Sequence, residues 1–335
     1  YQNFFDHCHQ QLIYLYSLVK CLYCSSFFMF KVKKLQINMK IKLGIAPIAW
    51  SNDDMPELGG DTPIETCLME AKSAGFNGIE LGGKFPRNPG TIKYLLNKFN
   101  IHLPGGWYRS KLRERSIDDE WQAMQDQIDL LKLVKASVFI FADQTESIQS
   151  DQNIPLSQRP KLEDREWNEF CKKISEISKR LADIGLPMSY HEHMGTIIQS
   201  EEDINRLLDN TNDETFLLYD TGHIMFAQGD YESILKKYVS RINHIHCKNI
   251  RKNVLEKSLS EDLSFRDAFL EGIFTVPGDG CIDYNPLFKI LFKNNYSKWV
   301  IVEAEQDPKK ANPLEYAKIG YNYLTKVLTE VGYKI

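Results

Sequence analysis

The sequence predicts an α/β protein that folds as a single (β/α)8 TIM barrel over residues 39–335, with an N-terminal extension outside the fold. From Met39 onward, eight short apolar runs typical of strands alternate with amphipathic stretches of helical length, the pattern of a closed parallel barrel. The alternative is an open doubly wound sheet, which usually has a Gly-rich phosphate-binding loop after its first strand. Residues 49–53 (AWSND) do not form such a loop, so the sequence favours the barrel.

The first half of the expected barrel follows the chain in strand–helix order. An apolar run at 43–50 predicts the first strand, and an Asp- and Gly-rich loop separates it from the first helix, which Gly75 terminates. The next strands are expected at 77–82, 101–107 and 138–142. The four helices that follow these strands are expected at 63–74, 91–99, 117–134 and 165–184, the last after a polar loop.

The second half contains four apolar runs that each end in a side chain with a lone pair to donate. These strands are expected at 188–193, 216–220, 242–246 and 299–303, and their helices at 201–208, 231–238, 284–292 and 313–331. The candidate donors are Glu192, Asp220, His246 and Glu303. Because the C-terminal ends of barrel strands meet at one mouth, these groups are expected to converge there. Such an oxygen-rich set suits Mn²⁺, Mg²⁺, Co²⁺ or Zn²⁺.

The alternation of side chains along a strand predicts, for some of these groups, which face of the strand they lie on, and leaves the position of others undecided. Tyr190 and Glu192 share one face of the fifth strand, and His191 and His193 share the other, so Glu192 lies opposite both imidazoles unless the strand has ended. His193 is then either at the mouth or a hydrogen-bonding neighbour of the centre. In the seventh strand His246 is nearer the mouth, and His244 is expected to be a satisfied core histidine.

Other polar groups near the strand ends are candidates for catalysis or substrate binding. Asp220 could cap a helix, but the next periodic helix begins near Asp230, so that role fits Asp230 better. His223 lies in the loop after Asp220 and is a candidate acid or base, with a packing role as the alternative. Glu305 lies one step further out than Glu303 on the same face. The early strands offer Trp50, Glu80, Lys84 and Trp107, which suit the wall of a polar-ring site.

The amino-acid composition limits the kinds of molecule that the protein is expected to bind. Hydrophobic residues make up 43% of the 335 residues, charged residues 26%, and the net charge is −4. Residues 1–38 carry four Lys and one Asp, which leaves 37 basic and 44 acidic groups in residues 39–335. This acidity argues against nucleic-acid binding. The seven Cys have no zinc-finger or disulfide spacing, and the pair Cys21/Cys24 lacks a surrounding βαβ pattern, so a cytoplasmic enzyme with reduced thiols is expected.

The first 38 residues differ from the rest. Residues 12–30 are rich in Phe, Tyr, Leu, Cys and Ser, so a signal peptide or short anchor is an alternative to a non-native or disordered extension. Lys20 near the middle is costly in a bilayer, and the early segment lacks a basic start, so no membrane association is expected. Met39 leads directly into the first strand and is the expected start of the protein.

Several segments together resemble the inosose dehydratases, which belong to the xylose-isomerase-like superfamily of metal-dependent barrels. The segments lie at 44–54, 58–63, 78–87, 190–196, 219–223, 274–280 and 302–308, and the similarity runs from about Lys42 to the C-terminus. The first segment and the run Gly-Gly-Lys-Phe-Pro-Arg at 82–87 are narrower signals than Asp-Thr-Gly-His at 220–223. Ketose 3-epimerases, hydroxypyruvate isomerases and endonuclease IV belong to the same superfamily.

The resemblance implies a metal-dependent hydro-lyase that dehydrates 2-keto-myo-inositol (scyllo-inosose) to a trihydroxycyclohexane-1,2-dione in inositol catabolism. It implies metal ligation by Glu192, Asp220, His246 and Glu303, and proton transfer by His223 with Glu303 or Glu192. The expected substrate contacts are Trp50, Lys84, Trp107, His193, Lys248, Arg251 and Glu305. One departure is Lys248-Asn249, where the superfamily often has Lys-Asp, so a charged role at position 249 is in doubt.

The implied cofactor is a divalent metal, Mn²⁺ or Co²⁺ first and Mg²⁺ or Zn²⁺ as alternatives, with no organic cofactor. A ketose 3-epimerase or hydroxypyruvate-type isomerase could use the same ligands and remains the alternative function. A DNA-repair endonuclease is disfavoured by the acidity and by too few histidines for a multi-zinc site. The expected partner is a small polyol ketone; the sequence leaves a homo-oligomer open.

Overall fold

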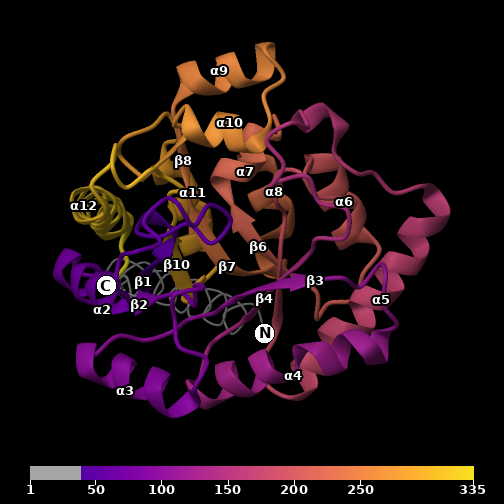
Figure 1. Cartoon of the computed structure of the whole chain (residues 1–335), viewed down its shortest axis with the longest axis horizontal. Coiled ribbons are helices and arrows are strands. Elements are labelled where there is room, and N and C mark those ends of the chain that lie inside the picture. Colours follow the sequence, from indigo (N-terminus) through magenta and orange to yellow (C-terminus); the bar gives the residue numbers. More distant parts are fainter. Residues whose placement is uncertain (1–38) are drawn as a thin grey trace, which may run out of the picture. The chain divides into compact units, whose positions relative to one another are not determined.

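The computed structural model describes residues 39–335, which contain an eight-stranded parallel sheet. The strands are β1 (Lys42–Ile45), β2 (Gly78–Ile79), β3 (Trp107–Ser110), β4 (Phe139–Asp143), β5 (Met188–His191), β6 (Phe216–Asp220), β7 (Ile242–Cys247) and β10 (Trp299–Val302). Their order in the sheet is β2-β1-β10-β7-β6-β5-β4-β3. Parallel bridges from Gly78 to His102 and from Leu81 to Gly106 join the two edges. The sheet therefore closes into the predicted barrel (Figure 1).

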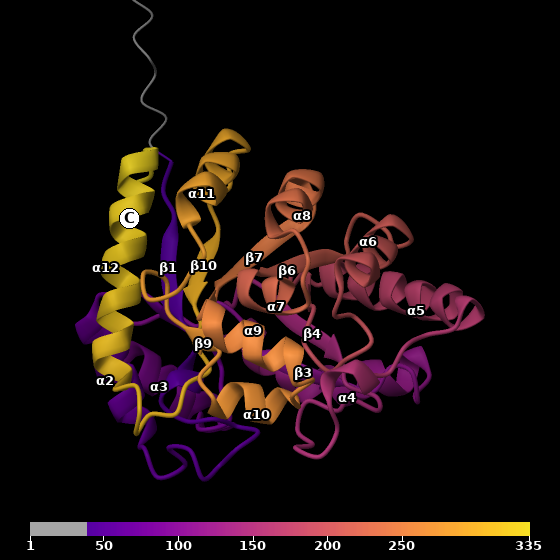
Figure 2. The same ribbon diagram turned by 90° about the horizontal axis from the view of Figure 1, so that it is seen from above.

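Helices surround the strands, as Figures 1 and 2 show, with α12 beside β1. The main helices are α2 (Ile64–Ala74), α3 (Pro89–Phe99), α4 (Ile117–Leu133), α5 (Asp164–Asp183), α6 (Glu201–Asp209), α8 (Tyr231–Tyr238), α11 (Tyr284–Lys293) and α12 (Pro313–Val331). Three short 3-10 helices are η1 (Pro47–Ala49), η2 (Leu156–Gln158) and η3 (Val239–Arg241). Local sequence explains the ends: Ser116 caps α4, Ser200 and Asp203 form a capping box at α6, and Gly75 ends α2 with φ 113°.

The mouth contains elements that the sequence did not predict. Helix α7 (Thr221–Phe226) begins directly after β6, and α9 (Lys252–Ser260) and α10 (Phe265–Leu270) lie between β7 and β10 in the chain. Strand β8 (Asn249–Ile250) pairs antiparallel with β9 (Phe274–Thr275), so this insertion folds back on itself. The described fold is therefore a barrel with an added cover of short helices after β7.

The third strand also lies further along the chain than expected. Residues 101–106 make isolated bridges, and the ladder with β4 begins only at Trp107. Pro104 has no N–H to donate, and Gly106 packs so closely that a Cβ there would lie 2.8 Å from the Cβ of Leu81. Proline and close backbone packing therefore replace a regular strand at this point.

The barrel interior changes from apolar to polar toward the mouth. Two small buried clusters lie among the strands, one of Val138, Ile140 and Leu218 and one of Ala46, Trp299 and Ile301. At or near the C-terminal ends of their strands, the buried side chains include Glu80, His191 and His246. Buried polar and ionisable groups are costly unless they are paired or bind an ion, so this layer indicates a functional site.

Among residues 39–335, no helix is long and apolar enough to cross a membrane. The interpretation of residues 1–38 as a dispensable extension lies outside the described residues. The carbonyl of Met39, the first described residue, accepts a hydrogen bond from the Lys334 N–H at 2.9 Å.

A chain that begins at Met39 should fold, bind metal and turn over substrate as the full chain does. The truncation retains the backbone hydrogen bonds that Met39 and Ile41 make with Lys334. Thermal unfolding by circular dichroism and a metal count on both chains are the measurements. A truncated chain that aggregates, or melts several degrees lower, would show that residues 1–38 contribute to the fold.

Candidate active site

A cavity of about 520 Å³ opens at the C-terminal ends of the strands. From the early strands and their loops it is lined by Lys84, Trp107 and Arg109, among others. From the later strands it is lined by His191, His193, His246, Glu303 and Glu305. A cavity of this size, with charged and imidazole groups converging on one wall, is typical of a small-molecule active site.

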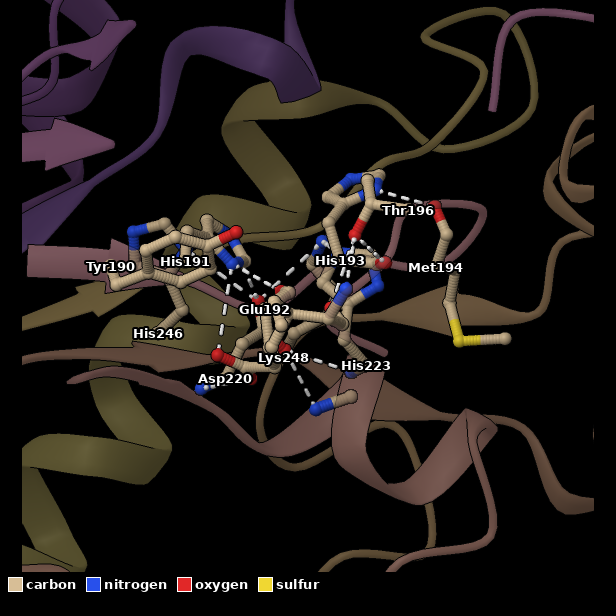
Figure 3. A network of polar contacts seen from close by, with 12 residues as sticks. Tyr190, His191, Glu192, His193, Met194, Thr196, Asp220, His223, His246 and Lys248 are labelled. Atoms are coloured by element: carbon tan, nitrogen blue, oxygen red, sulfur yellow. Dashed lines mark hydrogen bonds and ion pairs between the residues drawn. The ribbon is translucent and has the colours of Figure 1, made fainter. Parts of the chain in front are cut away.

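Four side chains on that wall place their donor atoms close together. His191, Asp220, His246 and Glu303 each offer one atom, and the four atoms lie within 4.8 Å of one another. The His246 Nδ1 atom is 2.5 Å from Glu303 Oε2. Asp220 Oδ2 lies 3.5 Å from His246 Nδ1 and 3.9 Å from His191 Nε2, and these three residues are labelled in Figure 3. The four side chains come from β5, β6, β7 and the end of β10. Four strands thus deliver one ligand each to a common point.

The donor atoms fit a divalent cation. Asp220 Oδ2, His246 Nδ1 and Glu303 Oε2 are buried and have no hydrogen-bond partner among residues 39–335. The other nitrogen of each imidazole is already engaged, since His191 Nδ1 contacts the Glu192 carbonyl and His246 Nε2 contacts Glu80 Oε1 at 3.2 Å. A backbone carbonyl and a carboxylate only accept, so each ring directs its free lone pair into the cluster. Two imidazoles and two carboxylates then match a tetrahedral or octahedral site for a borderline metal.

Glu192, an expected ligand, lies outside this cluster in the structure. Its Oε1 accepts a hydrogen bond from the Asp220 N–H at 3.0 Å, and its Oε2 lies 3.9 Å from His191 Nδ1. Burial, and then the Asp220 carboxylate, raise the pKa of Glu192 well above its usual value. Strand β5 continues to His191, so alternation directs His191 to the cavity and Glu192 away from it. His191, which the sequence argument had not chosen, stands in the place expected for Glu192.

Glu80 on the loop after β2 positions the His246 ligand. Its Oε1 contacts His244 Nε2 at 2.6 Å and His246 Nε2 at 3.2 Å. Burial alone would raise the pKa of Glu80, but the imidazoles of His246 and His244 lower it to about 2. His244 is fully buried, as expected for a satisfied core histidine. Glu80 is therefore a carboxylate that fixes the ring orientation of a candidate ligand.

Replacing Glu80 with Ala should weaken metal binding by roughly 10- to 100-fold, because His246 loses the partner that directs Nδ1 to the metal. Competition against a fluorescent chelator measures the affinity. Glu70→Ala is the control, because Glu70 contacts only the Trp50 indole on the helix side at 2.6 Å. Equal affinities in the two variants would contradict a positioning role for Glu80.

A second group of buried charges adjoins the cluster. The Lys248 Nζ atom lies 2.6 Å from Glu305 Oε1 and 2.9 Å from His223 Nε2. Burial raises the pKa of Glu305 to about 7, with Lys248 opposing the rise and Glu303 adding to it. Burial, followed by the charge of Lys248, lowers the pKa of His223 well below its usual value. Glu305 lines the cavity, and His223 packs behind His193 with ring centroids 4.0 Å apart.

Not all the expected substrate contacts face the cavity. Lys84, Trp107, His193 and Glu305 line it. The Trp50 indole N–H instead donates to Glu70 on α2, and Trp50 packs in the core between sheet and helices. Arg251 donates to the carbonyls of Gly272 and Phe274 and to Asp279, so it holds the β8–β9 insertion together. Trp50 and Arg251 are therefore structural in this fold, and Lys248 reaches carboxylates rather than the cavity wall.

Two adjacent aspartates in the loop after β1 contact the other mouth loops. Asp53 accepts a hydrogen bond from the Gly83 N–H at 2.7 Å, and Asp54 pairs with Arg109 and accepts from Gln149 Nε2 at 3.2 Å. Asp54, Arg109 and Gln149 also line the cavity. These three residues were not predicted from the sequence: Asp54 and Gln149 lie in loops without periodicity, and Arg109 lies in a strand that was expected to end at residue 107. The Asp53–Asp54 pair after a strand end was the one recognisable signal.

Comparisons with known proteins agree with this architecture. The family described as xylose isomerase-like TIM barrel matches residues 68–327. The chain is 42% identical to the rhizopine catabolism protein MocC of Rhizobium meliloti, over 89% of this chain and 91% of that protein. It is 41% identical to the inosose dehydratase of Lactiplantibacillus plantarum, over 87% of this chain and 97% of that protein.

Solved structures with the same fold are more distant in sequence. The probable 3-DHS dehydratase AsbF of Bacillus anthracis superposes with a TM-score of 0.65 at 15% identity, over 85% of this chain and 99% of that one. The IOLI protein with a bound zinc atom superposes with a TM-score of 0.58 at 15% identity, over 87% of this chain and 99% of that one. At these identities the likeness concerns the fold.

Proposed function

Because the chain belongs to the xylose isomerase-like TIM-barrel family, and within it to the inosose dehydratases, we propose that it is a hydro-lyase of inositol catabolism. Its proposed substrate is 2-keto-myo-inositol (scyllo-inosose), and its product is a trihydroxycyclohexane-1,2-dione. The observation that carries the proposal is the convergence of His191, Asp220, His246 and Glu303 at a cavity that Glu305, a further carboxylate, also lines. The four cysteines of residues 39–335 are free thiols, which supports a reducing compartment such as the cytoplasm.

We propose that His191, Asp220, His246 and Glu303 hold one divalent cation, Mn²⁺ or Co²⁺, with Zn²⁺ and Mg²⁺ as alternatives. The two imidazoles favour borderline metals over Mg²⁺. The IOLI protein, which has the same fold, binds zinc. When bound, such a cation supplies Lewis-acid polarisation of the substrate ketone.

Two residues of the cavity then carry the protons. Glu305 lines the cavity, and its pKa of about 7 makes it a stronger base than an ordinary carboxylate, so we assign to it removal of the proton next to the ketone. The hydroxyl on the next carbon leaves as water after it takes a proton from a cationic donor. Lys84, which also lines the cavity, is the assigned donor. Lys84 thus takes the acid role that was expected of His223. His223 packs against the His193 ring and contacts Lys248, on the far side of these residues from the cavity.

The remaining wall suits a polyol ring. Arg109 and Gln149 present donors, Asp54 presents acceptors, and Trp107 gives an apolar face between them. Trp107 also contacts the His191 and His193 rings, with centroids 5.0 and 5.5 Å away. A ring with alternating hydroxyls and apolar C–H faces is expected to match such a wall.

The test is incubation of the metal-reconstituted protein with 2-keto-myo-inositol, with the dione followed by its ultraviolet absorbance and by mass spectrometry. The proposal expects loss of one water per substrate, and expects a chelator to stop the reaction. An isomeric product of unchanged mass would instead identify an epimerase or isomerase. Absence of any conversion with each of the four metals would refute the proposed reaction.

A further inference from the structure

Lys248 occupies an unusual position for a lysine. It is fully buried, and its Nζ atom has acidic oxygens on several sides: Glu305 Oε1 at 2.6 Å, Glu303 Oε2 at 3.4 Å and Asp220 Oδ2 at 3.6 Å. His223 Nε2 completes the surroundings at 2.9 Å. Two of these groups are proposed metal ligands. The ammonium therefore lies beside the metal centre and shares its carboxylates (Figure 3).

The chain is built to hold this ammonium in place. A Cβ on Gly222 would lie 2.5 Å from Lys248 Cγ and 2.8 Å from its Cβ and Cδ, so only a glycine at the start of α7 leaves room for the stem. The Nζ atom also lies 4.7 Å from the centroid of the Phe274 ring, as in a cation–π contact. These contacts come from α7 and β9, two elements of the mouth.

The side chains near Lys248 include a second group whose geometry could hold a metal ion. His193, His223 and Glu305 are buried, and each offers a donor atom within 4.8 Å of the other two. The Lys248 ammonium can only donate, so it engages a lone pair of His223 and one of Glu305. Carboxylates shared between two cations about 3.5–4 Å apart are the usual arrangement of two-metal sites. Here Glu303 and Asp220 are shared between the proposed metal and the ammonium.

We propose that the Lys248 ammonium takes the place of a second divalent cation and thereby keeps the metal centre mononuclear. The inference rests on the metal centre proposed above. Asp220, Glu303 and Glu305 are the carboxylates within 4 Å of the Nζ atom, and the charge of one divalent cation together with one ammonium equals theirs. Without the ammonium an uncompensated buried charge remains beside three free donors, and such a charge is unfavourable unless a cation neutralises it. Removal of Lys248 should therefore create a second metal site at His193, His223 and Glu305.

The experiment counts cobalt. Full-length protein is saturated with CoCl₂, freed of excess by gel filtration and analysed for cobalt per chain by elemental analysis. The unmutated protein should hold about one ion, and Lys248→Met, which keeps most of the stem packing, should hold about two. Lys173→Met is the matched control, because Lys173 is a partly buried lysine that donates to the Leu112 and Arg115 carbonyls, and none of these residues lines the cavity. It should hold about one ion.

The double variant Lys248→Met/His223→Ala should return to about one ion, because it lacks a ligand of the created site. A folded Lys248→Met protein with one ion would overturn the inference, as would two ions in the unmutated protein. If Lys248→Met does not fold, a cobalt titration of the unmutated protein, followed by visible absorption, decides. A single saturating step supports the inference and two steps overturn it. No bound ion in the unmutated protein would overturn the metal centre as well, whereas two ions with normal dione formation would overturn only this inference.

Discussion

Asp220→Asn should leave the protein folded but without stoichiometric metal, and its turnover should fall by about 10³-fold or more. The substitution is chosen because Asp220 has two roles. Its Oδ1 caps α7 by accepting from the Gly222 and His223 N–H groups at 2.8 and 3.0 Å, and its Oδ2 faces the cluster without a partner among residues 39–335. Asparagine retains its carbonyl oxygen for the cap and places an NH2 group, which has no lone pair for a metal, at the position of Oδ2.

The size of the effect follows from the contribution of the metal. Lewis-acid stabilisation amounts to several kcal/mol, and each 1.4 kcal/mol corresponds to about tenfold in rate. Elemental analysis and steady-state kinetics are the measurements. Asp230→Asn is the control, because Asp230 caps α8 in the same way at 3.0 Å from the Ser233 N–H and lies outside the cluster. Full metal content in Asp220→Asn would remove Asp220 from the ligand set.

The same measurements distinguish His191 from Glu192. His191→Ala should lose most of the bound metal, whereas Glu192→Gln should retain it, because Glu192 Oε1 serves the Asp220 N–H and a glutamine oxygen can do the same. The reverse result would restore the ligand set expected from the sequence. Glu192 was chosen because it ends an apolar run, and the resemblance to related enzymes implied the same ligand, although side-chain alternation along the strand places Glu192 opposite His191.

Much of the barrel was predictable because the periodicity of apolar residues and the residues that begin and end helices are local signals in the sequence. Asp220, His246 and Glu303 could be found because each ends an apolar run, and parallel strands bring such ends together. Glu80 was recognised only as a wall residue, because its pairing with His246 joins positions 166 apart in the chain. No sequence pattern reports a contact between side chains on strands that lie that far apart.

The mouth was less predictable than the barrel. The sequence argument excluded a helix after Asp220, since its six residues are too few for a visible period, yet α7 begins there and Asp220 caps it. This short helix packs the His223 ring against the His193 ring. It also places Gly222, which has no side chain, against the stem of Lys248. Burial of Trp50 against Glu70 on α2 was equally hidden, because a tryptophan at a strand end can face either the cavity or the helices.

Glu305→Gln should lower turnover by roughly 10²- to 10⁴-fold while the protein keeps about one cobalt per chain, because Glu305 removes a proton and does not bind the first metal. The unmutated protein should also show a characteristic pH profile. Burial raises the pKa of Glu305 to about 7, and the base must be deprotonated. Turnover is therefore full above this pKa and declines as the pH falls through about 7. The variant should lack this limb in its residual activity.

Substrate deuterated next to the ketone separates the two proton transfers. In Glu305→Gln the deuteron should remain in place and no dione should form, because the first step fails. In Lys84→Met the deuteron should still exchange with solvent while the dione fails to form, since only protonation of the leaving hydroxyl is lost. Exchange that persists in Glu305→Gln would show that another group of the cavity wall is the base. His193 is then the first alternative. Its Nδ1 is engaged with the Met194 carbonyl at 2.8 Å, so its Nε2 lone pair is free to accept the proton.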